Sequence, residues 1–236
     1  MYNSRLLIAI LILCYSFNGF AQTQPKIEGT IIIGQVDSLY SEILQEQREI
    51  WISLPDNMDK TKQYPVIYLL DGSIHFQVVT GMLNQLSKWQ MPESIVVGII
   101  NTDRLRDFTP TNVSFSRGHK TETSGGAHNF MKFINQELKP YIESEYPTEN
   151  NTTIIGHSTA GLFVLYSYLQ EESPFDNYLA IEPSLWWDKE NLVNETPKLL
   201  KNGNRKEKSL YIAVANSLGK SMDTVKVRKE VSEPLS

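Results

Sequence analysis

Residues 152–163, Thr-Thr-Ile-Ile-Gly-His-Ser-Thr-Ala-Gly-Leu-Phe, are the stretch that decides the fold. A short apolar run leads into Gly-His-Ser, and small residues then lead into a second apolar run. This order predicts a strand, a sharp turn that presents Ser158, and a helix, the arrangement called a nucleophile elbow. The helix amino terminus would face the serine hydroxyl, and the N–H of Thr159 could stabilise an oxyanion. The alternative is a structural serine at a tight turn.

One position departs from the simple G-x-S-x-G pattern of such elbows. Ala160 stands where the pattern has its second glycine, and Gly161 follows one place later. Alanine adds a single methyl group, so we expect it to be tolerated if the backbone at position 160 avoids positive φ.

The segments around this stretch alternate between apolar runs and helical patterns. Continuous apolar runs, expected of parallel strands that are covered on both faces, occupy 65–70, 94–100, 152–155, 178–181 and 210–215. The helical stretches between them are 74–89, 127–146 (with a kink at Pro140) and 158–170, and an early strand pair is expected at 30–36 and 48–54. This alternation predicts an α/β fold with a mostly parallel, doubly wound sheet and functional residues at the carboxyl ends of its strands.

Composition and charge exclude several classes of protein. The 236 residues are 41% hydrophobic and 21% charged, values typical of a globular chain rather than a disordered, collagenous or coiled-coil one. The length suits a single domain. The net charge is -5 and no basic stripe stands out, so nucleic acid is not an expected partner. No particular oligomeric state is predicted.

The amino-terminal residues have the pattern of a signal peptide. Arg5 precedes an apolar run at 6–17, and Gly-Phe-Ala follows at 19–21. We expect cleavage after Ala21, export to the periplasm or the exterior, and a mature domain of 22–236. The run is too short for a membrane span, so no stable span is expected after cleavage; the alternative is an uncleaved anchor.

The chemistry open to the mature chain is limited by residue type. Cys14, the single cysteine, lies within the expected leader, which removes disulfides, thiol nucleophiles and cysteine-based zinc sites. No H-E-x-x-H, EF-hand or P-loop pattern is present, so we expect no metal and no cofactor. At 71–73, Asp-Gly-Ser ends a strand and opens a helix, where a backbone N–H of Gly72 or Ser73 could supply a second oxyanion donor. The alternative is an ordinary turn capped by Asp71.

Four segments together resemble a known family. The segments are 64–72, 101–111, 156–158 and 183–187, and their combination is similar to the Putative esterase family of α/β-hydrolases. That family includes siderophore esterases, esterase D-like enzymes, feruloyl esterases and mycolyltransferase relatives. The resemblance implies an α/β-hydrolase fold and hydrolysis of a small-molecule carboxylic ester through an acyl-enzyme on Ser158. It also implies an oxyanion hole at Thr159 and the loop after Asp71.

The catalytic base is absent from the place where the resemblance puts it. In α/β-hydrolases an acid and then a histidine follow the serine. The four histidines all precede Ser158: His75, His119, His128 and His157. We expect a C-terminally truncated hydrolase that lacks its last strand and the histidine loop. A catalytically silent relative that binds a ligand, or a substitute base among the four histidines, are the alternatives. Asp223 is the candidate acid, although some relatives manage with a Ser–His pair.

Several side chains are candidates for substrate binding because they follow strands. Arg104 and Arg106 come after 94–100 and could bind an anionic or catecholate-bearing substrate; the alternative is an ion network with Asp103 and Asp107 that braces the loop. Trp186 and Trp187 could form an aromatic wall or a packed core pair. We expect two histidines to line the same pocket: His75 and His157.

Overall fold

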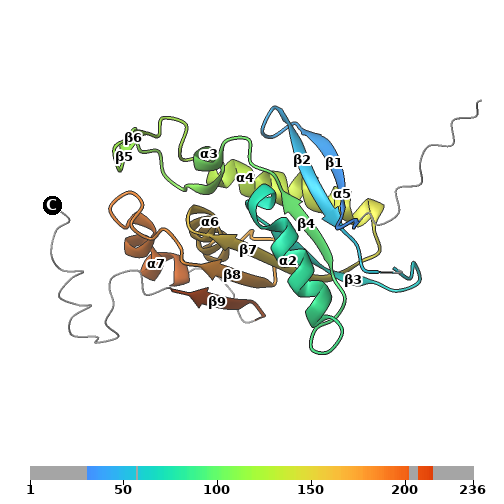
Figure 1. Cartoon of the computed structure of the whole chain (residues 1–236). Helices are drawn as coiled ribbons and strands as arrows, with labels where there is room; N and C mark the ends of the chain where they lie inside the picture. The colour runs from blue at the N-terminus through green and yellow to red at the C-terminus, as the bar shows by residue number, and fades with distance from the viewer. Residues whose placement is uncertain (1–30, 57, 202–206, 215–236) are drawn as a thin grey trace, which may run out of the picture. The chain divides into compact units, whose positions relative to one another are not determined.

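The computed structural model describes residues 31–56, 58–201 and 207–214 (Figure 1). The chain divides into two units, residues 1–32 and 33–236, and the architecture below is that of the second. The predicted signal peptide and Asp223 lie outside the described residues. In the described part of the chain, no helix has the length and apolar character needed to cross a membrane.

A seven-stranded mixed sheet forms the centre of the unit, in the order β1-β2-β4-β3-β7-β8-β9 (Figure 1). Five neighbouring strands, from β4 to β9, run parallel, and β1 and β2 run antiparallel at one edge. The predicted α/β fold with a mostly parallel sheet is confirmed. The strands are β1 (Gln35–Ser41), β2 (Glu46–Ser53), β3 (Tyr64–Leu69), β4 (Ile95–Ile99), β7 (Thr148–His157), β8 (Asn177–Ile181) and β9 (Ser209–Ala213).

Helices cover both faces of this sheet, because alternate residues of each central strand point to opposite sides. Tyr68 of β3 joins the larger core cluster with helices α4, η1, α5 and α6, whereas Leu69 packs against Phe76 of α2. Figure 1 shows α2 lying alone across its face. The helices are α2 (Gly72–Leu86), α3 (Arg104–Phe108), α4 (Ala127–Phe133), η1 (Ile134–Leu138), α5 (Lys139–Glu145), α6 (Thr159–Leu169) and α7 (Asn191–Lys201).

The first strand begins later than predicted. The apolar residues 31–33 favoured a strand over 30–36, but β1 spans Gln35–Ser41 and pairs with β2 from Gln35↔Ile52 to Ser41↔Glu46. Ile31 and Ile32 are 88% and 80% exposed. The physical reason is position: an edge strand needs only one buried face, so its sequence alternates and lacks a continuous apolar run.

The predicted helix 127–146 is present as three consecutive pieces. A π-helical turn, η1, precedes Pro140, which lies in the first turn of α5. Proline lacks an N–H and its ring excludes the carbonyl four residues earlier, so the wider π turn accommodates it without ending the helix. Elements without a sequence prediction are α3, α7 and a small hairpin of β5 (Phe115–Ser116) and β6 (His119–Lys120).

Candidate active site

Parallel register gathers four loops at one edge of the sheet. Gly98, Leu69, Ile155 and Leu179 lie side by side in β4, β3, β7 and β8. Parallel strands end at the same edge, so the residues three positions further along each strand lie in adjacent loops. Those residues are Asn101, Gly72, Ser158 and Glu182.

Ser158 occupies a sharp turn between β7 and α6. Its backbone has φ 59° and ψ −118°, and its N–H donates to the carbonyl of Ile181 at 2.9 Å. A non-glycine residue at positive φ is strained and persists where its surroundings hold it, a condition typical of active sites. The strand, turn and helix therefore follow the order that the sequence predicts.

Two glycines allow the elbow to close. A Cβ at position 156 would lie 2.5 Å from the carbonyl oxygen of Ala160, and one at position 161 would lie 2.9 Å from that of Ile181. Ala160 is helical, without positive φ, and fully buried. The alanine is tolerated because the close approach of α6 to β8 falls at Gly161.

Backbone N–H groups at the start of α6 and of α2 lie in the loops at this edge of the sheet. Thr159 is the first residue of α6, and Gly72 and Ser73 are the first two of α2. The opening N–H groups of a helix have no partner within it. Among the described residues, no acceptor bonds to the N–H of these three positions, so they are available to an oxyanion.

Asp71 joins the two loops through Arg104. The Asp71 carboxylate, 1% exposed as a residue, accepts from Arg104 Nε at 2.8 Å and Nη2 at 2.9 Å. The same Nη2 reaches the carbonyl of His157 at 3.4 Å, and Asn101 Nδ2 donates to Asp71 Oδ1, the oxygen that also accepts from Arg104 Nε. Asp71 also has φ 53°, which turns the chain from β3 into α2. One guanidinium thus ties the turn before α2 to the turn that presents Ser158.

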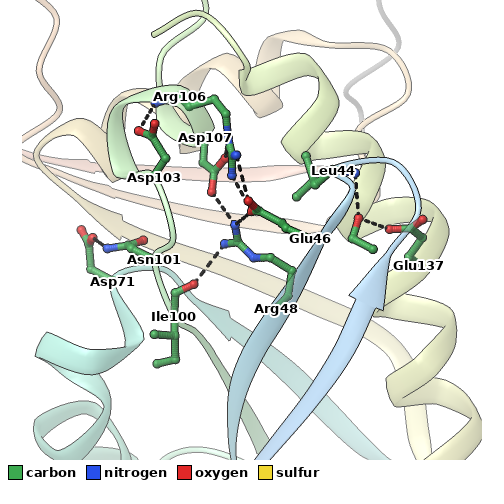
Figure 2. Close-up of polar contacts among 11 residues, drawn as sticks. Leu44, Glu46, Arg48, Asp71, Ile100, Asn101, Asp103, Arg106, Asp107 and Glu137 are labelled. Atoms are coloured by element: carbon green, nitrogen blue, oxygen red, sulfur yellow. Dashed lines mark hydrogen bonds and ion pairs between the residues drawn. The ribbon is translucent and has the colours of Figure 1, made fainter. Parts of the chain in front are cut away.

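A buried ion network holds α3, the helix that carries Arg104 (Figure 2). Arg48 of β2 is fully buried and donates to Glu46 at 2.7 Å and to Asp107 at 2.8 Å. Arg106 donates to both oxygens of Glu46, at 2.6 and 3.0 Å, and to Asp107 at 2.8 Å. The hydrogen bonds from Arg106 are the largest cause that lowers the pKa of Glu46 to about 2. Each of the two cations therefore contacts both carboxylates, while Nε of the buried Arg48 has no hydrogen-bond partner among the described residues.

Both predicted arginines form ion pairs, but of the expected network with Asp103 and Asp107 only the pair between Arg106 and Asp107 is present. Arg104 pairs with Asp71, 33 residues earlier, and Arg106 pairs with Glu46, 60 residues earlier, as well as with its neighbour Asp107. Asp103 caps α3 by accepting from the N–H of Arg106 at 3.0 Å. No local sequence signal marks Asp71 or Glu46 as partners, because Asp71 lies in the turn after β3 and Glu46 in β2, both distant in sequence from α3.

Four polar side chains lie around the turn at Ser158: His75, His157, Glu182 and Ser184. The rings of His75 and His157 meet edge to face with centroids 5.9 Å apart, and His157 Nε2 lies 3.9 Å from Glu182 Oε2. The Oγ of Ser158 lies 3.2 Å from that of Ser184, which is 4% exposed. In the part of the chain that is described, no histidine forms a hydrogen bond with the Ser158 hydroxyl. Ser184 and Glu182 are site residues that the sequence did not single out.

The two tryptophans differ in exposure. Trp187 is 2% exposed, belongs to the core, and its Nε1 donates to Thr111 Oγ1 at 3.1 Å. The substrate-binding assignment of Trp187 is therefore corrected to core packing. Trp186 is 39% exposed, with the guanidinium of Arg117 3.5 Å from its ring centroid. Among the described residues, no three metal-ligating side chains come together.

Comparisons with known proteins agree with this geometry. The family model described as Putative esterase matches residues 41–231. The chain is 33% identical over 215 residues to ferri-bacillibactin esterase BesA of Bacillus subtilis, covering 84% of this chain and 73% of that protein. It is 30% identical over 158 residues to the siderophore enterobactin esterase of Emericella nidulans, covering 59% of this chain and 52% of that protein. This chain thus spans about half the length of the second relative.

Solved structures share the fold. An IroE-like serine hydrolase from Shewanella oneidensis matches with a TM-score of 0.73 and 36% identity, over 78% of this chain and 61% of that one. The BES protein from Bacillus cereus matches with a TM-score of 0.70 and 28% identity, over 86% of this chain and 84% of that one.

Proposed function

Since the chain belongs to the Putative esterase family, whose model matches residues 41–231, we propose that it is a serine carboxylic ester hydrolase. Ser158 is the nucleophile. The observation that carries this proposal is the strained turn at Ser158, with φ 59°, placed at the amino terminus of α6 beside unpaired N–H groups. A purely structural serine has no need of that backbone conformation.

The proposed reaction passes through an acyl-enzyme. Ser158 Oγ attacks the ester carbonyl carbon while a base takes the hydroxyl proton. The tetrahedral oxyanion accepts hydrogen bonds from the N–H of Thr159 and from Gly72 or Ser73, and it collapses as the C–O bond to the alcohol breaks. The alcohol leaves with the proton, and water then releases the acid by the same route. Each preorganised donor contributes about 10²–10³-fold in rate in enzymes of this type.

The proposed substrate is a siderophore ester. BesA and the Emericella protein are named for ferri-bacillibactin and enterobactin. Their sequence identities to this chain, 33% and 30%, support a shared substrate class. The half-exposed Trp186, close to Ser184, offers an apolar surface for an aromatic acyl group. The predicted signal peptide adds to this proposal that the enzyme acts outside the cytoplasm.

Activity of the serine is tested by labelling and turnover. The protein of residues 22–236 is treated with a fluorophosphonate probe and with p-nitrophenyl acetate. We expect Ser158→Ala to abolish the labelling and turnover, because loss of the nucleophile removes several orders of magnitude in rate. Ser144→Ala, at an exposed serine of α5, is the matched control. A folded chain whose labelling equals that of Ser158→Ala would instead be a ligand-binding relative.

Substrate class and export need separate measurements. Enterobactin and bacillibactin are incubated with the enzyme, and release of the catecholyl acid fragments is followed by mass spectrometry. Turnover of p-nitrophenyl acetate alone would retain the esterase and reject the siderophore. For export, the complete chain is expressed in a bacterial host, and we expect a mature amino terminus at Gln22. An uncleaved chain in the membrane fraction would contradict export.

A further inference from the structure

The hairpin β5–β6 presents Arg117 in a strained conformation. Arg117 and Gly118 form its two-residue turn, with φ 46° and 82°. Positive φ at both central positions is typical of a tight hairpin turn, for which asparagine, aspartate or glycine is favoured at the first position. An arginine there strains the backbone, which points to a use for its side chain.

The base of this hairpin is held firmly. Thr121 and Ser124 are each 4% exposed, and Thr121 Oγ1 donates to the carbonyl of Val113. Asn112 Nδ2 donates to the carbonyls of Glu122 at 2.9 Å and Ser124 at 2.7 Å. The turn that carries Arg117 therefore projects from a hydrogen-bonded support.

Arg117 is a cation without a carboxylate partner in the described part of the chain. Its guanidinium carbon lies 3.5 Å from the ring centroid of Trp186, and the residue is exposed. Arg104 and Arg106 each pair with carboxylates, whereas no carboxylate in the described ranges pairs with Arg117. Stacking on an indole holds the guanidinium in place and leaves the N–H groups at its edge free.

A series of contacts connects this cation to Ser158. The N–H of Trp187 donates to the carbonyl of Ser184 at 3.1 Å, so Trp186 belongs to a single turn that starts at Ser184. The Oγ of Ser184 lies 3.2 Å from that of Ser158. Trp187 Nε1 bonds to Thr111, which fixes this turn against the segment leading into the hairpin.

We propose that Arg117, supported by Trp186, forms a subsite for an oxyanion group on the substrate, a carboxylate or a catecholate. This subsite rests on the proposed function, because it sets which esters Ser158 receives. The N–H groups along one edge of the planar guanidinium bind two oxygens of such a group at once. The indole covers one face of the guanidinium and excludes water from it. The fixed hairpin sets the distance between the anionic group and the scissile ester.

The test is a binding measurement that needs no turnover. In a Ser158→Ala background, tryptophan fluorescence is titrated with methyl 4-carboxybenzoate and with methyl 4-carbamoylbenzoate, which differ by one charge. We expect the carboxylate to bind at least 10-fold more tightly. Arg117→Gln lowers this preference at least 10-fold, and Arg117→Lys, which keeps the charge but loses the fork, lowers it about 3-fold or more. Trp186→Phe removes most of the signal.

The matched control is Lys120→Gln, which removes a cation from the same hairpin at an exposed residue whose Nζ lies 3.7 Å from Glu122 Oε1. We expect it to change the preference by less than about 2-fold, because charge alone at a solvated site is weak. Three outcomes would each overturn the subsite. Lys120→Gln and Arg117→Gln could have equal effects, Arg117→Gln could weaken binding of both ligands equally, or the parent could show no preference for the carboxylate. Retained preference without any labelling of Ser158 would instead reject only the hydrolase.

Discussion

Trp186 and Trp187 are neighbours in sequence and lie in opposite environments. The side chain of Trp187 packs in the core and donates to Thr111, whereas that of Trp186 is half-exposed beneath Arg117. The turn from Ser184 to Trp187 produces this difference, because consecutive residues of a turn point in different directions.

Replacing each tryptophan by phenylalanine separates packing from exposure. Trp187→Phe removes buried ring atoms and leaves Thr111 Oγ1 without its donor, so we expect a loss of about 2–3 kcal/mol in the free energy of unfolding. Trp186→Phe changes it by less than about 0.5 kcal/mol. Urea denaturation measures both. Equal losses would contradict the division of the pair between core and surface.

Arg104 and Asp71 act together as a positioning pair. Arg104→Met leaves the buried Asp71 carboxylate with Asn101 alone, and we expect the rate of fluorophosphonate labelling at Ser158 to fall about 10–100-fold. The double variant Asp71→Asn with Arg104→Met removes the stranded charge, so it regains stability. Its labelling rate should stay as low as that of Arg104→Met. Recovery of labelling in the double variant would show that the pair serves stability alone.

Among the elements, α6 approaches the sheet closely at Gly161. Glycine at 161 lets the helix backbone approach the end of β8, while Val164 and Leu162 fill the core further along. On the opposite face α2 also carries a glycine, Gly81, which has nothing within 4 Å of where a Cβ would stand.

Alanine at these two helical glycines should have effects of opposite sign. Gly161→Ala forces a contact of 2.9 Å with the carbonyl of Ile181, so α6 must shift and the free energy of unfolding falls by about 1–3 kcal/mol. Gly81→Ala gains helix propensity without a clash and raises the free energy of unfolding by about 0.5–1 kcal/mol. Thermal and urea denaturation of both variants provide the measurement, and a neutral Gly161→Ala would reject the close packing described for the elbow.

Across the whole molecule, the ion network links the antiparallel edge of the sheet to the active-site loops. Arg48 and Glu46 come from β2, Arg106 and Asp107 from α3, and Arg48 also lies over Phe130 of α4 with 5.3 Å to the ring centroid. The network therefore makes the position of Arg104 depend on strands far from Ser158.

Acid should weaken this link. The pKa of Glu46 is about 2 in the folded protein against an ordinary value of 4.5, so its stabilisation is complete above pH 4.5 and is lost as the pH falls toward 2. We expect Glu46→Gln to lower the free energy of unfolding by about 1–3 kcal/mol at pH 7 and by much less at pH 3. Glu93→Gln, at an exposed loop residue, is the control. A difference that is the same at both pH values would contradict the assigned pKa.

Continuous apolar runs made the parallel strands and the elbow predictable, because burial on both faces leaves a strong local signal at 65–70 and 152–155. Contacts between distant segments left none. Arg117 and Trp186 are neither periodic nor close in sequence. Arg104 and Arg106 pair with Asp71, in the turn after β3, and with Glu46 of β2. Edge strand β1 was misplaced for the related reason that its pattern is only half apolar.

The position of the close contact at Gly161 also bears on how relatives can be found. A search written strictly as G-x-S-x-G passes over this chain, since the fifth letter is Ala160. A pattern that asks for a small residue at that place and glycine one step later follows the steric requirement of the helix instead. The elbow is then defined by the space that its backbones require, and sequences that depart from the usual motif can still meet this requirement.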